Sequence, residues 1–379
     1  MLRRLFAYTL SILLFLCFLS SGRAQQVEPK LQSLMEQHKA VGLAAVVVKN
    51  GKIIYEKSFG YKHLESQTLL SPKDIFRIAS ISKSFSATAI MQLLAKKKLS
   101  LDDDVSDLIG FKVRNPKYPD VPITLRMLLS HRSSLNDSRG YFTLDSINPA
   151  VSANWEKCYN DYKPGTKYQY CNLNFNIVGT IIERVSGERF DEYIRRHILE
   201  PLKLYGGYCV DSLNSDLFVT LYEYDRGKQT FTPSEGAYAP RREEIRNYKM
   251  GYSTPIFSPT GGMKISAGDL ARYMIMHMNY GKSGKVRIIP KKYARLMQTP
   301  VAPDNGYGLA LTKNKNLIPG LELTGHTGSA YGLYSTMFFD PKKQFGFVVI
   351  TNGCVFTSDG DTTTLLKKAI NILYEEFIK

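Results

Sequence analysis

The residues whose types and spacing could do chemistry begin with Ser80 and Lys83, which form the only Ser-x-x-Lys of the chain. Ile78, Ile81 and Ile90 accompany them at roughly helical spacing, which predicts that Ser80 lies in the first turn of a helix. Residues three apart share one helix face, so we expect the Lys83 amine beside the Ser80 hydroxyl. A helix N-terminus adds partial positive charge and free N–H groups, which suit a nucleophile that becomes an oxyanion adduct.

Two further motifs could supply partners for this pair. Tyr170-x-Asn172 is the only Tyr-x-Asn of the chain and comes just before an apolar helical pattern. Residues 326–329 read His-Thr-Gly-Ser within a strand-like segment, where the glycine would let a ligand backbone approach closely. Each motif alone also has a structural interpretation: Tyr170 as a half-buried tyrosine, Asn172 as a helix N-cap, and His326 as a surface residue of a strand.

The elements that must position these motifs follow from the hydrophobic pattern. The pattern predicts a helix over 27–40, a hairpin over 43–60 around Asn50-Gly51, and helices over 172–185 and from Ser266 to Gly281. It predicts strands at 321–324, 333–339 and 345–351, and a closing helix over 362–379. Residues 205–259 have no clean period, and a long loop of this kind is often functional.

Strands at both ends with helices between them predict an α/β fold. We expect an antiparallel sheet flanked by helices, built from residues 25–98 and 300–379, with a mostly helical insertion over residues 99–299. The sequence has no internal repeat and no low-complexity segment.

The N-terminus predicts export. Two arginines, a short apolar run and small residues near Ala24 are typical of a secretory signal over residues 1–24, so we expect a periplasmic or secreted protein. The alternative is a retained membrane anchor, but the run is short for a membrane span. No second apolar run of that length follows.

Composition narrows the classes of partner. The formal net charge of +16 falls to about +13 without the signal, which could favour acidic substrates, but the basic residues form short scattered runs typical of solvated faces. We therefore expect no nucleic-acid binding.

No Cys-x-x-Cys or His-Glu-x-x-His occurs, so neither a metal nor a cofactor is expected. Cysteines 158, 171, 209 and 354 allow three disulfide pairings, among which the sequence cannot choose. The oligomeric state is open.

Taken together, the three motifs resemble those of the serine β-lactamase and penicillin-binding superfamily. The resemblance is greatest to the branch of class C β-lactamases, D-Ala-D-Ala carboxypeptidases, related (family VIII-type) esterases and some acyltransferases. It extends to residues 99–103, 123–131, 259–263 and 307–309, and so covers nearly the whole chain after the signal. The family fold is an α/β sheet domain with an inserted helical domain, and its active site lies between the two.

The resemblance implies acyl transfer through a covalent serine. Ser80 would be the nucleophile, and Lys83 and Tyr170 would relay its proton if the site shifts at least one of their pKa values. The resemblance also implies the substrate-binding residues. Asn172 would hold Lys83 and the substrate amide, and His326 and Thr327 would line a carboxylate pocket. Gly328 and Ser329 of the same motif would complete the binding site. Backbone N–H groups of Ser80 and Ser329 would form the oxyanion hole.

Departures from the family pattern limit the choice of substrate. His326 stands where class C β-lactamases usually carry lysine, Cys171 replaces a small residue, and residues 132–134 read Arg-Ser-Ser instead of Thr-Ser-Gly. An unperturbed histidine is mostly neutral at neutral pH, so we expect slow β-lactam hydrolysis and weaker carboxylate binding at pH 7.5 than at pH 6. His131 and His277 are interpreted as structural.

Three functions remain open. The favoured one is a serine hydrolase that cleaves an ester or amide, including a D-Ala-type peptide, of a small-molecule or peptide acyl donor. The second is an acyltransferase that passes the acyl group to an alcohol or amine, with residues 205–259 forming an apolar acceptor site. The third is a penicillin-binding sensor with little turnover. Fold-level analogy cannot separate them.

Overall fold

The fold centres on one antiparallel sheet. The structure is a computed structural model of the chain, which describes residues 26–360 and 362–379. The sheet has seven strands in the order β11 (Thr312–Asn314), β12 (Leu323–Ala330), β13 (Leu333–Asp340), β14 (Phe345–Thr351), β1 (Gly42–Lys49), β2 (Lys52–His63) and β3 (Thr68–Leu69). All neighbouring pairs are antiparallel. The expected α/β class with strands from both ends of the chain is confirmed.

The two ends of the chain meet in the middle of this sheet. Asn50 and Gly51 both have positive φ, as a type I′ turn requires, and so fold β1 back onto β2. The other edge of β1 pairs with β14, with Val46 opposite Val348. Strand β12 runs through the whole of the 326–329 motif, which the sequence analysis placed in a strand-like segment.

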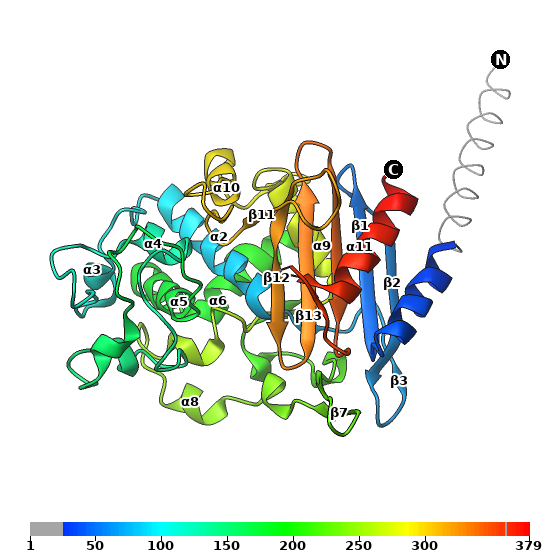
Figure 1. The fold of residues 1–379 in the computed structure, drawn as a ribbon. Coiled ribbons are helices and arrows are strands. Elements are labelled where there is room, and N and C mark those ends of the chain that lie inside the picture. Colours follow the sequence, from blue (N-terminus) through cyan, green and yellow to red (C-terminus); the bar gives the residue numbers. More distant parts are fainter. Residues whose placement is uncertain (1–25, 361) are drawn as a thin grey trace, which may run out of the picture.

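Alternating side chains of the strands contribute to two cores, one on each face of the sheet. Val47 and Phe347 pack under an N-terminal helix (residues 26–37) and helix α11 (Thr364–Phe377), which lie side by side (Figure 1). Val46 and Val348 face the opposite way, toward helix α9 (Ala267–Met278). The sheet is therefore covered on both faces.

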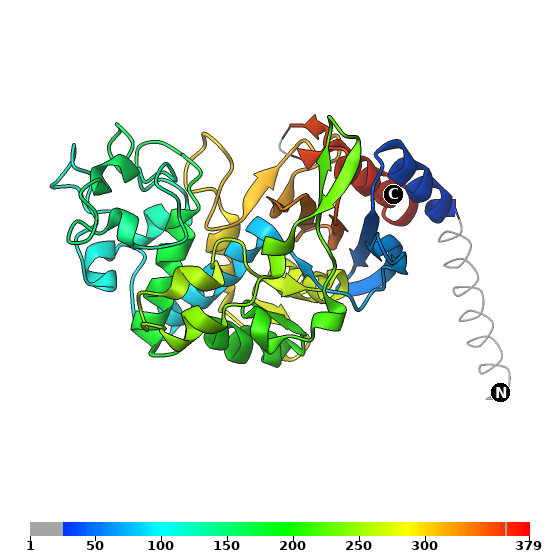
Figure 2. The ribbon, with the colours of Figure 1, turned by 90° about the horizontal axis from the view of Figure 1, so that it is seen from below.

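A lobe of helices and long loops lies beside the sheet (Figure 2). Helix α2 (Ser82–Ala95) runs from the sheet into this lobe and packs against α5. The other helices between the two halves of the sheet are α3 (Val105–Ile109), α4 (Leu125–Leu129), α5 (Leu173–Ser186), α6 (Phe190–Ile194), α7 (Glu200–Leu202), α8 (Arg242–Arg246) and α10 (Lys291–Gln298). No helix of residues 26–360 and 362–379 has the length and apolar character needed to cross a bilayer.

One helix of the expected insertion, residues 99–299, packs on the sheet. Helix α9 lies within residues 99–299, yet it packs against β1, β13 and β14 because its buried stripe matches that face of the sheet. The segment 205–259 also carries more structure than expected, including a hairpin of β6 (Tyr222–Asp225) and β7 (Thr230–Pro233). The expected signal over residues 1–24 lies outside the described residues.

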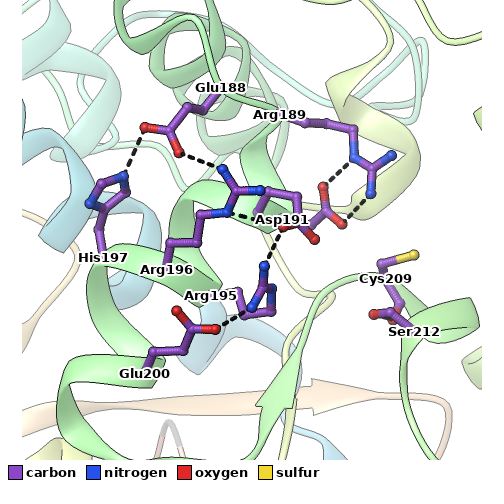
Figure 3. Close-up of polar contacts among 10 residues, drawn as sticks. Glu188, Arg189, Asp191, Arg195, Arg196, His197, Glu200, Cys209 and Ser212 are labelled. Carbon is purple, nitrogen blue, oxygen red and sulfur yellow. Dashed lines mark hydrogen bonds and ion pairs between the residues drawn. The ribbon is translucent and has the colours of Figure 1, made fainter.

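A surface network of ion pairs surrounds α6 and the π-helical turn that follows it (Figure 3). Arg189 pairs with Asp191, while Arg195 bridges Glu192 and Glu200. Acidic side chains of the same segment thus neutralise its basic residues.

The four cysteines of the described residues are buried free thiols, and none of them forms a disulfide. The open question of pairing is thereby answered for these residues.

Candidate active site

Ser80 and Lys83 lie side by side where α2 begins. Ser80 sits in a 3-10 turn (Ala79–Ile81) that leads directly into the helix, and Lys83 Nζ lies 3.1 Å from Ser80 Oγ. Ala79 has φ of +50°, a left-handed conformation that is strained for a residue with a Cβ. The nucleophile predicted from the sequence is therefore presented on a tight, strained turn.

The other contacts of the Lys83 amine orient it. Nζ donates to Asn172 Oδ1 and to the Thr260 carbonyl, both at 2.9 Å. A neutral amine has two N–H groups and one lone pair, and these two oxygens can only accept. With both N–H groups engaged, the lone pair is directed at Ser80 Oγ.

Burial sets the charge of this amine. The Lys83 side chain is fully buried, which lowers its pKa to about 7, while the Asp137 and Cys171 side chains act in the opposite direction. A substantial fraction of Lys83 is therefore neutral near neutral pH, as a general base requires.

Tyr170 completes a triangle with the first pair. Its hydroxyl hydrogen-bonds with Ser80, and Lys83 Nζ lies 4.8 Å from the centre of its ring. Burial raises the pKa of the phenol, although the Ser80 hydrogen bond lowers it in part. Tyr170 thus holds its proton at neutral pH and can act as an acid.

Asp137 organises the site, although no sequence pattern indicated it. Its carboxylate accepts from the backbone N–H groups of Asn172 and Leu173 at the start of α5, at 2.8 and 3.0 Å. It also accepts from Asn172 Nδ2 at 3.0 Å, which turns the amide oxygen of Asn172 toward Lys83. The only signal for Asp137 is its acidity within a basic loop, and its partners lie 34 residues or more along the chain.

Strand β12 lies close to the turn that carries Ser80. A Cβ on Gly328 would lie 2.3 Å from the Ile78 carbonyl oxygen and 2.4 Å from Ser335 Oγ, so this approach requires glycine. Ser329, the next residue, lines the same cavity as Ser80. The two expected oxyanion-hole residues therefore face one space.

His326 is held as a neutral ring. Its Nδ1 contacts the Thr327 carbonyl, which only accepts, so Nδ1 carries the proton and Nε2 accepts from the Tyr307 hydroxyl at 3.0 Å. Burial, followed by the charge of Lys83, lowers the pKa of His326 to about 4. We predicted that carboxylate binding would weaken between pH 6 and pH 7.5. That prediction is wrong, because the His326 ring does not titrate in that range.

Two adjoining cavities meet at these residues. The first, of about 630 Å³, contains Ser80, Asn172 and Ser329, together with Tyr141, Phe142 and Tyr331. The second, of about 860 Å³, lies toward Tyr168, Tyr307 and Lys313. Tyr170, His326 and Thr327 line both cavities, whereas Ser80 lines only the first.

The structure does not support an apolar acceptor site formed by residues 205–259. Only Glu223 and Ser258 of that segment line the first cavity, and both are polar. The tyrosines of this segment pack elsewhere: Tyr238, for example, stacks on Phe218. The aromatic wall comes instead from Tyr141, Phe142 and Tyr331.

Comparison with known proteins identifies this arrangement. The profile of the family described as Beta-lactamase matches residues 27–370. The chain belongs to the β-lactamase family. Among curated relatives, Penicillin-binding protein 4 of Amycolatopsis lactamdurans is 26% identical over 87% of this chain and 86% of its own length. Protein flp of Staphylococcus aureus (strain MW2) is 24% identical over 88% of this chain. The match spans only 64% of that relative, so the chain covers less than two thirds of its length.

Solved structures show the same fold. The octameric penicillin-binding protein homologue from Pyrococcus abyssi has a TM-score of 0.73 and 28% identity, over 93% of this chain and 77% of that one. EstCE1, described as a hydrolase with promiscuous acyltransferase activity, has a TM-score of 0.72 and 22% identity, over 93% and 99% of the two chains. D-amino acid amidase from Ochrobactrum anthropi SV3 has a TM-score of 0.68 and 19% identity, over 93% and 98%.

Departures from the β-lactamase family pattern have local structural consequences. Ser134, at a position where the pattern has glycine, keeps the left-handed conformation with φ of +65°. Arg132 donates from Nη1 to both carboxylate oxygens of Asp304, at 3.0 Å each. His131 is fully buried and its Nδ1 accepts from the Cys171 N–H at 3.1 Å. This hydrogen bond helps to fix the backbone next to Tyr170.

Proposed function

We propose that this chain is a serine hydrolase that cleaves an ester or amide through a covalent acyl-Ser80 intermediate. One observation carries the proposal: a buried amine at Lys83 with two acceptor-only partners and its remaining position 3.1 Å from Ser80 Oγ. Such an amine can take the Ser80 proton at neutral pH.

In the acylation step, Ser80 Oγ forms a bond to the substrate carbonyl carbon while its proton passes to Lys83 Nζ. The negative charge that develops on the carbonyl oxygen lies against the N–H groups of Ser80 and Ser329, each worth about 3 kcal/mol in comparable sites. The bond to the leaving group then breaks. The leaving group takes the Tyr170 hydroxyl proton, and the Lys83 ammonium returns a proton to Tyr170.

In the second step, water attacks the acyl-enzyme with the same groups in reversed roles, and Ser80 is regenerated. The leaving group must receive its proton from Tyr170, which lines both cavities, whereas Ser80 lines only the first. The acyl group therefore occupies the first cavity, and the leaving group departs toward the second.

A second candidate is transfer of the acyl group to an alcohol or amine instead of water. This transfer is favoured because Tyr170 lines the second cavity, so any nucleophile that enters that cavity meets the same proton-transfer group. EstCE1, similar in fold, is named for such promiscuity. A penicillin-binding sensor with little turnover is the third candidate, and export through the signal at residues 1–24 remains part of the proposal.

The test is turnover of a chromogenic ester with and without added alcohols, together with labelling by a fluorophosphonate or a β-lactam. Ser80→Ala should abolish both turnover and labelling. Ser84→Ala is the matched control, because Ser84 lies on the same helix and its hydroxyl donates to the Ile81 carbonyl. Undiminished labelling of Ser80→Ala would refute the proposal. Stable labelling of the wild type without turnover would favour the sensor.

A further inference from the structure

Arg77 is a buried cation in the wall of the first cavity. The residue is 9% exposed and lies three positions before Ser80. Its Nε donates to the Gly261 carbonyl at 3.2 Å and its Nη1 to the Ala237 carbonyl at 3.1 Å. The guanidinium carbon lies 4.9 Å from the centre of the Tyr331 ring. These contacts fix the orientation of the guanidinium group.

These contacts do not neutralise the charge or use every donor of Arg77. Within residues 26–360 and 362–379, no carboxylate forms an ion pair with Arg77 and no acceptor is bonded to Nη2. Nη2 is also not among the fully buried polar atoms without a partner, so it keeps accessible surface. Because Arg77 lines the first cavity, this free donor is available to a molecule bound there.

Other charged groups near Arg77 do not supply a counter-ion. Lys264, opposite Arg77 in the small sheet of β4 (Phe76–Arg77) and β8 (Lys264–Ile265), is itself basic and donates to the Tyr208 carbonyl at 2.6 Å. Arg241 adds further positive charge nearby. Glu223 lines the cavity as well, but it is exposed and forms no ion pair with Arg77.

We propose that Arg77 binds a carboxylate carried by the acyl part of the substrate, so that the preferred acyl donors are anionic. The inference rests on the proposed function, which places the acyl group in the first cavity beside Ser80. A desolvated guanidinium without a counter-ion is unfavourable in the free protein, and a bound carboxylate relieves that cost through charge-assisted hydrogen bonds. Tyr141, Phe142 and Tyr331 would contact the apolar chain between the ester and the carboxylate.

The experiment compares matched pairs of p-nitrophenyl esters on the full chain. Each pair has acyl chains of equal length, one ending in a methyl group and one in a carboxylate: hexanoate against monoadipate, and octanoate against monosuberate. We expect kcat/KM to favour the carboxylate ester by about tenfold or more in at least one pair, the gain typical of a hydrogen bond to a charged group. The preference should persist at high ionic strength, which screens attraction by the net positive charge of the chain.

Two variants locate the preference. Arg77→Met, which removes the charge and keeps an apolar chain, should bring the ratio of the two kcat/KM values close to one. Arg126→Met is the control for net charge, because Arg126 is solvent-accessible and paired with Asp102. It should keep the wild-type ratio.

The outcomes separate this inference from the proposed function. If the wild type hydrolyses both members of each pair equally well, or the neutral ester better, the Arg77 site is refuted and the hydrolase remains. If Arg77→Met keeps the preference, another residue binds the carboxylate and the inference is wrong. If no ester is hydrolysed and Ser80 is not labelled, the proposed function fails and the inference fails with it. Because the wild-type ratio alone can refute the site, the test does not depend on Arg77→Met folding.

Discussion

At the scale of single residues, one physical cause gives Lys83 and Tyr170 different roles in the proposed mechanism. Lys83 is fully buried and Tyr170 is partly buried, and burial disfavours the charged form of each. For an amine the uncharged form is the base, and for a phenol it is the acid. The sequence indicated that Lys83 and Tyr170 share a proton, but the direction of transfer depends on burial, which the motif does not contain.

The pH dependence of catalysis should follow Lys83. Because the neutral amine is the active form, kcat/KM should rise as pH increases through about 7 and level off above it. His326→Gln should leave this inflection in place, since His326 has a pKa of about 4 and stays neutral throughout the range. Steady-state kinetics between pH 5 and pH 9 measure both profiles. Loss of the inflection in His326→Gln would assign the titration to the histidine.

Tyr170→Phe should impair substrates in proportion to their need for a proton. An alkoxide or amide anion is a poor leaving group and needs the Tyr170 proton, whereas p-nitrophenolate leaves without one. We expect kcat to fall by about 100-fold or more for alkyl esters and amides, and much less for p-nitrophenyl esters. Equal losses on both classes would mean that the hydroxyl acts mainly on Ser80.

At the scale of elements, the active site depends on how the start of α5 and strand β12 are fixed. The hydrophobic stripe of α5 and the Asn50-Gly51 turn are local signals, and the structure confirms both elements. Asp137 and the packing of α9 on the sheet depend on residues far apart in the sequence. No local period encodes such contacts, which is why the sequence analysis missed both Asp137 and the packing of α9.

Asp137→Asn should destabilise the start of α5 and lower the pKa of Lys83. The substitution replaces one carboxylate oxygen with a donor, so at least one of the N–H groups of Asn172 and Leu173 loses its acceptor. We expect a loss of about 1–2 kcal/mol in unfolding free energy. The acid limb of kcat/KM should move to lower pH, because removal of the negative charge lowers the pKa of Lys83.

Chemical denaturation and a pH profile test this prediction. Asp225→Asn is the control, since Asp225 also accepts from backbone N–H groups, of Gly227 and Lys228, in a turn on the surface. It should leave the pH profile unchanged. A shift of the Asp137→Asn profile to higher pH would contradict the electrostatic role.

Gly328→Ala should separate β12 from the turn that carries Ser80. The new methyl group would meet the Ile78 carbonyl oxygen at 2.3 Å, and a backbone carbonyl cannot move aside without moving Ser80. We expect kcat/KM to fall by about 100-fold, the effect of a lost oxyanion-hole donor. Gly207→Ala, where the nearest atom is the Leu213 Cδ2 at 3.7 Å, should retain activity. Full activity of Gly328→Ala would show that the close approach is not needed for catalysis.

At the scale of the whole molecule, two cores on either side of the sheet hold the fold, and no disulfide cross-links residues 26–360 and 362–379. Cys158, Cys171, Cys209 and Cys354 are buried free thiols. A thiol reagent should therefore leave them unmodified in the folded protein and react with them after denaturation. The melting temperature should not change when a reductant is added. A lower melting temperature in reductant would reveal a disulfide.

The position of β1 in the sheet has a consequence for how the protein is made. One edge of this valine-rich strand pairs at once with β2, but the other edge waits for β14, with Val46 opposite Val348. Until β14 has left the ribosome, the early hairpin exposes an unpaired apolar edge of the kind that promotes aggregation. Strand β12 and its Gly328 are also translated late. The nascent chain must therefore be kept from aggregating while it is still catalytically silent, and activity can arise only after β12 and β14 have been synthesised.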